Sequence, residues 1–441
     1  MVQTTPKTPM MSRMRTWQRF SIFILLGMLL SWLISCGGPS STDRSATNGT
    51  AEVEFWTMQL QPKFTSYFED LIASFEGDHP DKQVSWVDVP WSAMQSKILT
   101  AVSAKTAPDV VNLNPDFAFQ LASRNAWLTL DDKITPEARD RYLPKIWQAS
   151  TLNGESFGIP WYLTSRIAIY NTQLFQQADI KQPPKTYAEL ATAAKQIKEK
   201  TGKYAFFITL VPEDSAELME ALVQMGVELV DQSGNAAFNT PAGKAAFEYW
   251  IDLYKDGLLP KEVLTQGHRR AIELYQAGET ALLSSSPEFL STIATNAPDI
   301  AEVSASSSQI TGETGKKAVA VMNLVIPRDT QNPDAALDFA LFVTNNENQL
   351  AFAKAANVLP STVDALEDEY FQSVPEDAAA ADKARLVSAQ QLEDAEVLVP
   401  PLPDIKQLQK ILYENLQAAM LGEKSADEAL ADAEEAWNSR S

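Results

Sequence analysis

Hydrophobic and polar positions follow two spacings in the part of the chain that begins near residue 50. Residues 84–89 alternate with period two up to Pro90, whereas residues 64–75 repeat their apolar side chains every three to four positions. Period two is typical of a strand, and the longer spacing is typical of an amphipathic helix. Up to residue 114 the pattern predicts strands at 53–56, 84–89 and 108–114 and helices at 64–75 and 96–104.

The same two spacings continue to the end of the chain. They predict strands at 166–170, 204–210, 280–284 and 317–326, helices at 186–199, 215–225, 241–255, 271–277 and 333–344, and a helical tail from 404 with its last helix at 425–437. Strands that alternate with helices predict an α/β fold with mostly parallel sheets. Such sheets bind ligands beyond the carboxyl ends of their strands, here the loops 56–62, 112–117, 159–165, 207–215, 284–289 and 321–324.

The first 35 residues carry basic but no acidic side chains and contain an apolar run at 20–30. This run is shorter than the roughly 20 apolar residues that span a bilayer, so the segment 1–35 is predicted to be a secretion signal. It ends in Leu-Ile-Ser-Cys-Gly-Gly, which resembles a bacterial lipobox with Cys36 as the residue that receives the lipid. The alternative is a plain signal peptide with a chance cysteine. Residues 36–50 are small and polar, as expected of a flexible tether.

Cys36 is the only cysteine of the chain, and the net charge is −21. A lipidated Cys36 leaves no thiol for a disulfide, a nucleophile or a metal site. The acidic balance excludes nucleic acid as a partner and disfavours a polyanionic ligand.

Sequence signals for catalysis and for metal or cofactor binding are missing. The two histidines, His79 and His268, are interpreted as surface residues. The chain has no Gly-x-Ser-x-Gly elbow, phosphate-binding loop or His-Glu-x-x-His helix, and residues 231–235 lack the closing glutamate of a calcium loop. We therefore expect no catalytic residue, no metal and no cofactor.

Aromatic residues lie near several of the predicted loops: Trp56, Trp91, Trp161, Tyr162, Phe206, Phe207 and Phe289. Aromatic rings stack on the apolar faces of sugars, although most aromatic side chains of a protein serve its core. The predicted loop position of Trp161 and Tyr162 favours a role in binding a solute.

Four stretches together resemble the sugar-type extracellular solute-binding proteins of ABC importers, the class that includes maltose-binding protein. They are Ala-Pro-Asp-Val within 101–132, Tyr-Asn and Pro-Pro-Lys-Thr within 167–197, Phe-Asn-Thr-Pro within 238–257, and Ala-Ala-Leu-Asp-Phe within 334–344 followed by Val-Leu-Pro at 358–360. The resemblance covers the chain from about residue 53 to its last helix.

The resemblance implies a two-lobe periplasmic-binding-protein fold of type II, whose lobes close on a ligand by a hinge motion. One lobe would comprise 51–167 plus 325–365 and the other 168–324 plus 366–441. It implies a monomer at the periplasmic or extracellular face that delivers a carbohydrate or polyol to membrane permease subunits, here anchored by a lipid on Cys36.

The resemblance also implies ligand-binding positions. Asp116 matches an acidic position that accepts sugar hydroxyls, and Glu288 stands where the family often has a tryptophan. The complete expected set is Trp56, Gln59, Asn114, Asp116, Trp161, Tyr162, Phe207, Glu213, Asp214, Ser286, Glu288 and Asn323.

Three other functions stay open at this point. A phosphorylated ligand such as a glycerol phosphodiester needs clustered cations, but the expected loops offer only Lys63 and Arg166. A secreted carbohydrate-active enzyme and a lipoprotein without a transport role are the other two.

Overall fold

The structure is a computed structural model that describes residues 50–212, 214–399, 402 and 404–440. The predicted signal, Cys36, the tether up to residue 49 and Glu213 lie outside the described residues. None of the described helices has the length and apolar composition that crossing a bilayer requires.

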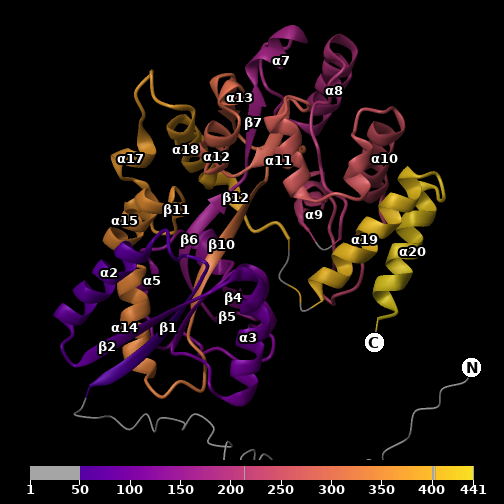
Figure 1. Ribbon diagram of the computed structural model, residues 1–441. Helices are drawn as coiled ribbons and strands as arrows, with labels where there is room; N and C mark the ends of the chain where they lie inside the picture. Colours follow the sequence, from indigo (N-terminus) through magenta and orange to yellow (C-terminus); the bar gives the residue numbers. More distant parts are fainter. Residues whose placement is uncertain (1–49, 213, 400–401, 403, 441) are drawn as a thin grey trace, which may run out of the picture. The chain divides into compact units, whose positions relative to one another are not determined.

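The larger sheet has the strand order β11-β6-β10-β3-β1-β2, with β12 paired to β10. Figure 1 labels all of these strands except β3. Its strands are β1 (Ala51–Met58), β2 (Lys82–Val89), β3 (Val110–Leu113), β6 (Ile159–Ser165), β10 (Lys317–Val325), β11 (Leu359–Pro360) and β12 (Ala395–Glu396). β1 is parallel to both β2 and β3. The carboxyl ends of these three strands therefore lie at one edge of the sheet, where ligand loops are expected.

Helices and a short hairpin accompany this sheet. They are α2 (Thr65–Asp78), α3 (Trp91–Ala104), α4 (Pro115–Ala122), α5 (Pro136–Arg139), α6 (Pro144–Gln148), β4 (Thr151–Leu152), β5 (Glu155–Ser156), α14 (Pro333–Val343), α15 (Asn346–Ala356), α16 (Val363–Leu366) and α17 (Glu369–Gln372).

The smaller sheet has the order β8-β7-β9. It consists of β7 (Ile167–Asn171), β8 (Leu282–Ser285) and β9 (Ser304–Ser307), and β7 is antiparallel to both neighbours. Its helices are α7 (Thr172–Gln177), α8 (Tyr187–Thr201), α9 (Glu217–Gln224), α10 (Pro241–Lys255), η1 (Lys261–Leu264), α11 (His268–Gln276), α12 (Phe289–Asn296), α13 (Pro298–Glu302), α18 (Ala380–Gln390), η2 (Gln391–Asp394), α19 (Ile405–Met420) and α20 (Ala426–Asn438).

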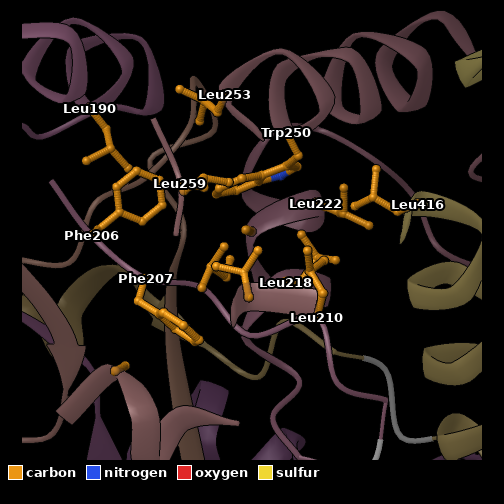
Figure 2. Close-up of a cluster of buried hydrophobic side chains, with 14 of the residues drawn as sticks. Leu190, Phe206, Phe207, Leu210, Leu218, Leu222, Trp250, Leu253, Leu259 and Leu416 are labelled. Carbon is orange, nitrogen blue, oxygen red and sulfur yellow. The ribbon is translucent and has the colours of Figure 1, made fainter. Parts of the chain in front are cut away.

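Buried hydrophobic side chains form three clusters. The first core draws on residues between 53 and 162 and between 322 and 356. The second core draws on residues between 167 and 293, on residue 384 and on residues between 405 and 437 (Figure 2). A smaller linking core comprises Ile146, Leu163, Val319, Val321, Ala353, Leu359, Phe371, Ala389, Leu392 and Ala395. The switch from first to second core along the chain falls between Tyr162 and Ile167, where β6 passes into β7.

α10 illustrates how local sequence produces the second core. Thr240 caps the helix by accepting a hydrogen bond from the Gly243 amide, and Pro241 occupies the first turn, where its missing N–H is harmless. Phe247 and Trp250 are almost completely buried, and burying a large apolar side chain contributes about 1.5–3 kcal/mol. Gly243 has no room for a Cβ atom, because that atom would lie 1.8 Å from the Phe238 carbonyl oxygen.

Two predictions about the sheets were wrong. Residues 204–210 form no strand and contribute only an isolated bridge from Tyr204 to Thr280. This run is apolar because Phe206, Phe207, Ile208 and Leu210 are buried in the second core, and an apolar run alone does not distinguish a strand from a buried loop. The sheets are also mixed rather than mostly parallel, because β10 is antiparallel to β3 and β6 and the smaller sheet is wholly antiparallel.

Candidate functional site

A rigid loop follows β1 at the carboxyl edge of the larger sheet. The Asp88 carboxylate accepts hydrogen bonds from the Thr57 hydroxyl at 2.6 Å, the Leu60 amide at 2.9 Å and the Gln61 amide at 3.0 Å. Gln59, inside this loop, is exposed and has a φ of 54°. The expected ligand residue Gln59 is therefore presented to solvent from a loop whose backbone is fixed on both sides.

Asn114 and Asp116 lie at the end of β3 and have different roles. Asn114 caps α4, since its side-chain oxygen accepts the Phe117 amide at 2.9 Å. Asp116 is exposed in the first turn of α4, where the helix dipole favours a negative charge. Its carboxylate lies 3.5 Å from the ammonium of Lys406 on α19.

This ion pair connects elements of the first and second cores. The Lys406 ammonium also lies 3.4 Å from the Gln409 side-chain oxygen, and the Gln409 amide donates to the Ser215 carbonyl at 3.0 Å. A chain of polar contacts therefore runs from α4 beside the larger sheet to Ser215, just before α9.

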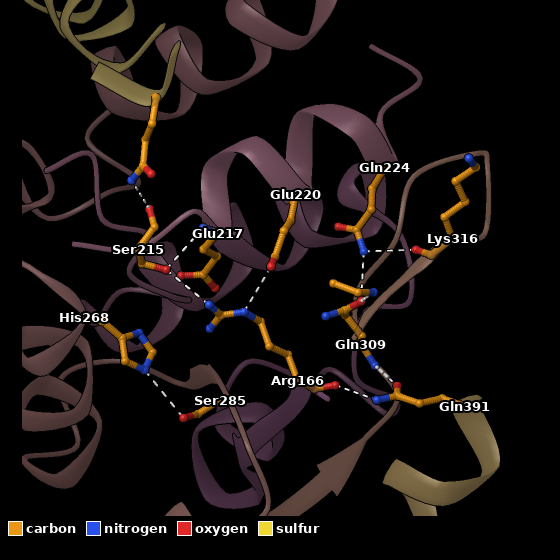
Figure 3. A network of polar contacts seen from close by, with 12 residues as sticks. Arg166, Ser215, Glu217, Glu220, Gln224, His268, Ser285, Gln309, Lys316 and Gln391 are labelled. Atoms are coloured by element: carbon orange, nitrogen blue, oxygen red, sulfur yellow. Dashed lines mark hydrogen bonds and ion pairs between the residues drawn. The ribbon is translucent and has the colours of Figure 1, made fainter. Parts of the chain in front are cut away.

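Ser215 belongs to a network around Arg166, the residue between β6 and β7 (Figure 3). The Arg166 guanidinium donates to the Glu220 carboxylate at 3.0 Å and to the Ser215 hydroxyl at 3.1 Å. Burial lowers the pKa of Arg166, but the charges of Glu220 and Glu217 outweigh burial and raise it above its usual value. Arg166 is thus a permanent cation whose charge is already paired inside the protein.

A small cavity that is open to solvent adjoins this network. Arg166, Glu217 and Glu220 contribute polar groups to its wall, and Phe206, Phe207 and Trp250 contribute apolar surface. Phe207, which was expected to bind ligand, therefore lines a cavity of the second core.

His268 lies beside the same network at the start of α11. Its backbone amide donates to the Asp214 carboxylate at 2.6 Å, and its ring packs edge-on against Phe289 with 6.3 Å between the ring centres. Burial lowers the pKa of His268, whereas the carboxylates of Glu217 and Asp214 act in the opposite direction. His268 is thus partly exposed and partly buried, as is His79, and the interpretation of both as surface residues is not contradicted.

A small crevice lies where β6, the loop after β8 and α18 meet. Residues 163–165 of β6 form one wall, and Ser286 and Glu288 form another. Burial, followed by the negative charge of Glu288, raises the pKa of the neighbouring Tyr162. The structure thus brings together Tyr162, Ser286 and Glu288, three of the expected ligand residues.

Three other expected ligand residues are buried in the interior of the protein: Trp161, Trp56 and Asn323. The prediction of a loop at Trp161 and Tyr162 was wrong, because β6 already begins at Ile159 and both side chains are buried. The Trp161 indole packs against Phe352, with 4.8 Å between the ring centres. Trp56 lies in β1 beneath the Lys97 ammonium, which is 3.8 Å from the ring centre. Asn323 is buried in β10 and accepts the Ser150 hydroxyl at 2.5 Å.

Sequence reasoning missed Glu217, Glu220 and Gln224 on α9. Their spacing of three and four residues was available as a signal, because it marks one polar stripe on an otherwise apolar helix. No comparable signal identifies Lys406, whose partner Asp116 is 290 residues away in the sequence. Among the described residues, no group of three or more His, Cys, Asp or Glu side chains is arranged to hold a metal ion.

Comparisons with known proteins agree with this architecture. A candidate oligosaccharide periplasmic-binding protein from Synechococcus sp. MITs9220 is 47% identical and superposes with a TM-score of 0.80, over 88% of this chain and 98% of that one. The cyclic alpha-maltosyl-1,6-maltose binding protein of Arthrobacter globiformis, at 21% identity, has the same fold with a TM-score of 0.77 over 88% of this chain and 98% of that one. The diacetylchitobiose binding protein DasA of Streptomyces coelicolor is 25% identical over 417 residues, which are 92% of this chain and 94% of that protein.

The fold is therefore that of the maltose-binding-protein-like periplasmic binding proteins, as the resemblance implied. The model of one family, described as bacterial extracellular solute-binding protein, matches residues 61–350. Because this match spans well over half of the sequence, the chain belongs to the bacterial extracellular solute-binding protein family.

Proposed function

We propose that the chain captures a sugar, glycoside or polyol between two lobes and delivers it to the permease of an ABC importer. The lobes would be 51–167 plus 325–365 and 168–324 plus 366–441, which approximates the division into the first and second cores. Met322 and Leu324 also pack in the first core, so we draw the second crossing a few residues before 325, and the proposal is otherwise unchanged.

One observation carries this proposal: hydrogen-bonding groups from both cores meet. Asp116 from the first core reaches Lys406 beside the second, and Tyr162 lies close to Glu288. Carboxylate, ammonium and phenol groups can bind the hydroxyls of a neutral solute once they exchange these internal contacts for ligand contacts. Closure by a hinge then follows if the ligand makes contacts with both lobes.

The charges support a neutral ligand over a glycerol phosphodiester. Arg166 is committed to Glu220 and Ser215, and Lys406 is paired with Asp116. The negative charges of Asp214 and Glu288 nearby would repel a phosphate. DasA and the Arthrobacter protein, whose names state saccharide ligands, support the carbohydrate class.

We further propose that the chain binds its ligand without turnover, as a monomer tethered to a membrane of the cell envelope by a lipid on Cys36. Membership in a family of extracellular binding proteins supports this location. A Cys36→Ala variant should move from the membrane fraction to the soluble fraction of the producing cell. Retention of that variant in membranes would contradict the lipid anchor, and hydrolysis of chromogenic glycosides by the purified protein would contradict binding without turnover.

The decisive experiment is a calorimetric titration with sugars, polyols and glycosides, supported by thermal unfolding. A ligand at 100 times its dissociation constant should add about 2.7 kcal/mol to the free energy of unfolding. Asp116→Ala should weaken that binding about tenfold, because hydrogen bonds to a charged group contribute about 1.5–3 kcal/mol. The matched control is Asp252→Ala, which removes an exposed carboxylate from α10. Absence of binding to every member of the panel would overturn the carbohydrate proposal.

A further inference from the structure

Trp91 is an exposed indole at the carboxyl edge of the larger sheet. Within the described part of the chain, the large hydrophobic side chains that remain exposed are Trp91, at 42%, and Leu421, at 57%. Trp91 is the first residue of α3 and follows Pro90, directly after β2 ends at Val89. A single exposed apolar side chain needs no explanation by itself, so its surroundings decide what it means.

The loop beside Trp91 is conformationally strained. The Trp91 amide donates to the Gln59 side-chain oxygen at 3.4 Å. Gln59 has the left-handed φ of 54°, which costs a non-glycine residue on the order of 1 kcal/mol and persists only where the surroundings impose it. Asp88 imposes it here through its bonds to Leu60 and Gln61. Strain of this kind is concentrated at ligand sites, which makes the Gln59–Trp91 corner a candidate for one.

A continuous row of polar side chains connects Trp91 with Asp116. Gln95 lies one helical turn after Trp91 on α3, and its amide donates to the Gln120 side-chain oxygen at 3.3 Å. Gln120 lies one turn after Asp116 on α4, so residues four apart share a face on both helices. Asp116 in turn pairs with Lys406. The exposed indole therefore continues the surface on which the proposed ligand residues lie.

The sheet fixes the length of this surface. β2 and β3 flank β1 on opposite sides, so their ends lie about 10 Å apart at the usual strand spacing of about 4.8 Å. Trp91 and Asp116 lie two and three residues beyond these strand ends, on different helices. A ligand that offers one whole ring face to Trp91 and a further ring to Asp116 matches this separation, as two or more linked rings do.

We propose that Trp91 is an outer subsite that stacks on a second or third sugar ring, so that the ligand is a disaccharide or a longer glycoside. The apolar C–H face of a pyranose matches the indole face, and the amides of Gln59 and Gln95 match its hydroxyls. Leu421, the other exposed hydrophobic residue, follows the last turn of α19 and offers no aromatic face. This inference rests on the proposed function and specifies the size of its ligand.

The test measures, by calorimetry, the affinity of the protein for three series of saccharides. Each series has members with one, two and three sugar rings. These series are glucose, maltose and maltotriose; arabinose and its α-1,5-linked di- and trisaccharides; and N-acetylglucosamine with its β-1,4-linked di- and trisaccharides. In the series that binds, Trp91→Ala should weaken the longer members about tenfold, the scale of a lost aromatic contact, and should leave the single-ring member unchanged. Trp91→Phe should retain most of the affinity, and Leu421→Ala should leave all affinities unchanged.

The possible failures are distinguishable. If the wild-type protein binds no member of these series or of the wider panel of sugars, polyols and glycosides, the proposed function fails and the subsite fails with it. If it binds only single-ring sugars or polyols, the proposed function stands and the subsite is wrong. If sugars bind but Trp91→Ala affects all lengths equally or none, only the subsite is wrong. Unchanged sugar affinities together with weaker binding of Trp91→Ala to permease-containing vesicles would identify the indole as a permease contact and would also overturn the subsite. Because the Trp91 side chain is exposed, its substitution should not impair folding. Thermal unfolding midpoints equal to that of the wild-type protein would verify this.

Discussion

At the scale of single residues, Arg166, Glu220 and Asp214 near the junction of β6 and β7 already bond to other groups of the protein. Arg166 bonds to Glu220 and Ser215, and Asp214 accepts the amide of His268. Partly buried charges are retained only when they are paired, because an unpaired charge loses its hydration without compensation. A ligand that enters this region gains only by replacing such contacts, which favours hydroxyl groups that both donate and accept.

His268 should make stability depend on pH. Its pKa is lowered in the folded protein chiefly by burial, so the unfolded chain binds a proton more readily. As pH falls below the ordinary histidine value of about 6.5, the unfolded state gains protons and the free energy of unfolding falls. Urea unfolding between pH 8 and pH 5 should therefore show that wild type loses stability relative to His268→Gln as pH decreases. His79→Gln is the control, and a wild-type advantage that grows toward pH 5 would contradict the argument.

Sequence reasoning about individual residues succeeded where a loop position was correctly predicted. Ser286 and Glu288 follow β8 in a loop and line a crevice with β6, as their place after a strand suggested. Trp161 was misjudged because residues 159–165 were predicted to form a loop; Pro160 is compatible with the beginning of the strand that these residues form. Whether the expected residues bind ligand stays a prediction.

At the scale of elements, three buried glutamines join α9 to the segments that pass between the two cores. The Gln391 amide donates to the Ser165 hydroxyl at 2.8 Å and to the Arg166 carbonyl at 2.6 Å, and its oxygen accepts the Gln309 amide of the backbone at 3.1 Å. The Gln309 side chain then accepts from Gln224 on α9 at 3.0 Å and from the Ala318 amide at 2.6 Å. The path of the chain at the junction is thus fixed by side chains rather than by a strand ladder alone.

Gln391→Ala should lower the free energy of unfolding by about 2–3 kcal/mol, because buried groups of Ser165, Arg166 and Gln309 lose their partner together. Gln407→Ala, an exposed position on α19, is the control and should change stability by less than about 0.5 kcal/mol. Denaturant unfolding measures both variants. Equal stability of the two would show that water replaces Gln391 and that the junction does not depend on it.

Most elements were predictable from hydrophobic spacing, and α10 matches its predicted range, 241–255, from end to end. Local signals suffice there, because the cap, the first-turn proline and the apolar face all lie within the segment. Strand direction was not predictable in this way, since the spacing of β10 is the same whether its neighbours are parallel or antiparallel. The contact between α4 and α19 depends on the complete chain path, which no local pattern encodes.

At the scale of the whole molecule, binding requires that contacts between the two halves be weak enough to exchange. Asp116 and Lys406 are both about half exposed, and exposed pairs contribute only about 0–1 kcal/mol. The linking core and the buried glutamines instead provide a permanent connection at the junction. Hinge closure on a ligand requires a strong connection at the junction, which acts as the hinge. It also requires a weak connection at the ion pair, which must open and close.

Lys406→Glu should therefore favour separation of the halves, because it places two carboxylates where an ion pair stood. We expect a larger radius of gyration without ligand, measured by small-angle scattering, and an affinity for the bound sugar that is about two- to fivefold weaker, in line with a pair of this exposure. Both differences should shrink in high salt, which screens charges that are open to solvent. Lys410→Glu is the matched control, because it reverses a charge one turn further along α19, where the ammonium pairs with Glu414 of the same helix. The argument fails if the radius of gyration of Lys406→Glu is unchanged or if both variants change equally. The ion pair would then be a consequence of how the two halves are positioned and would not contribute to that position.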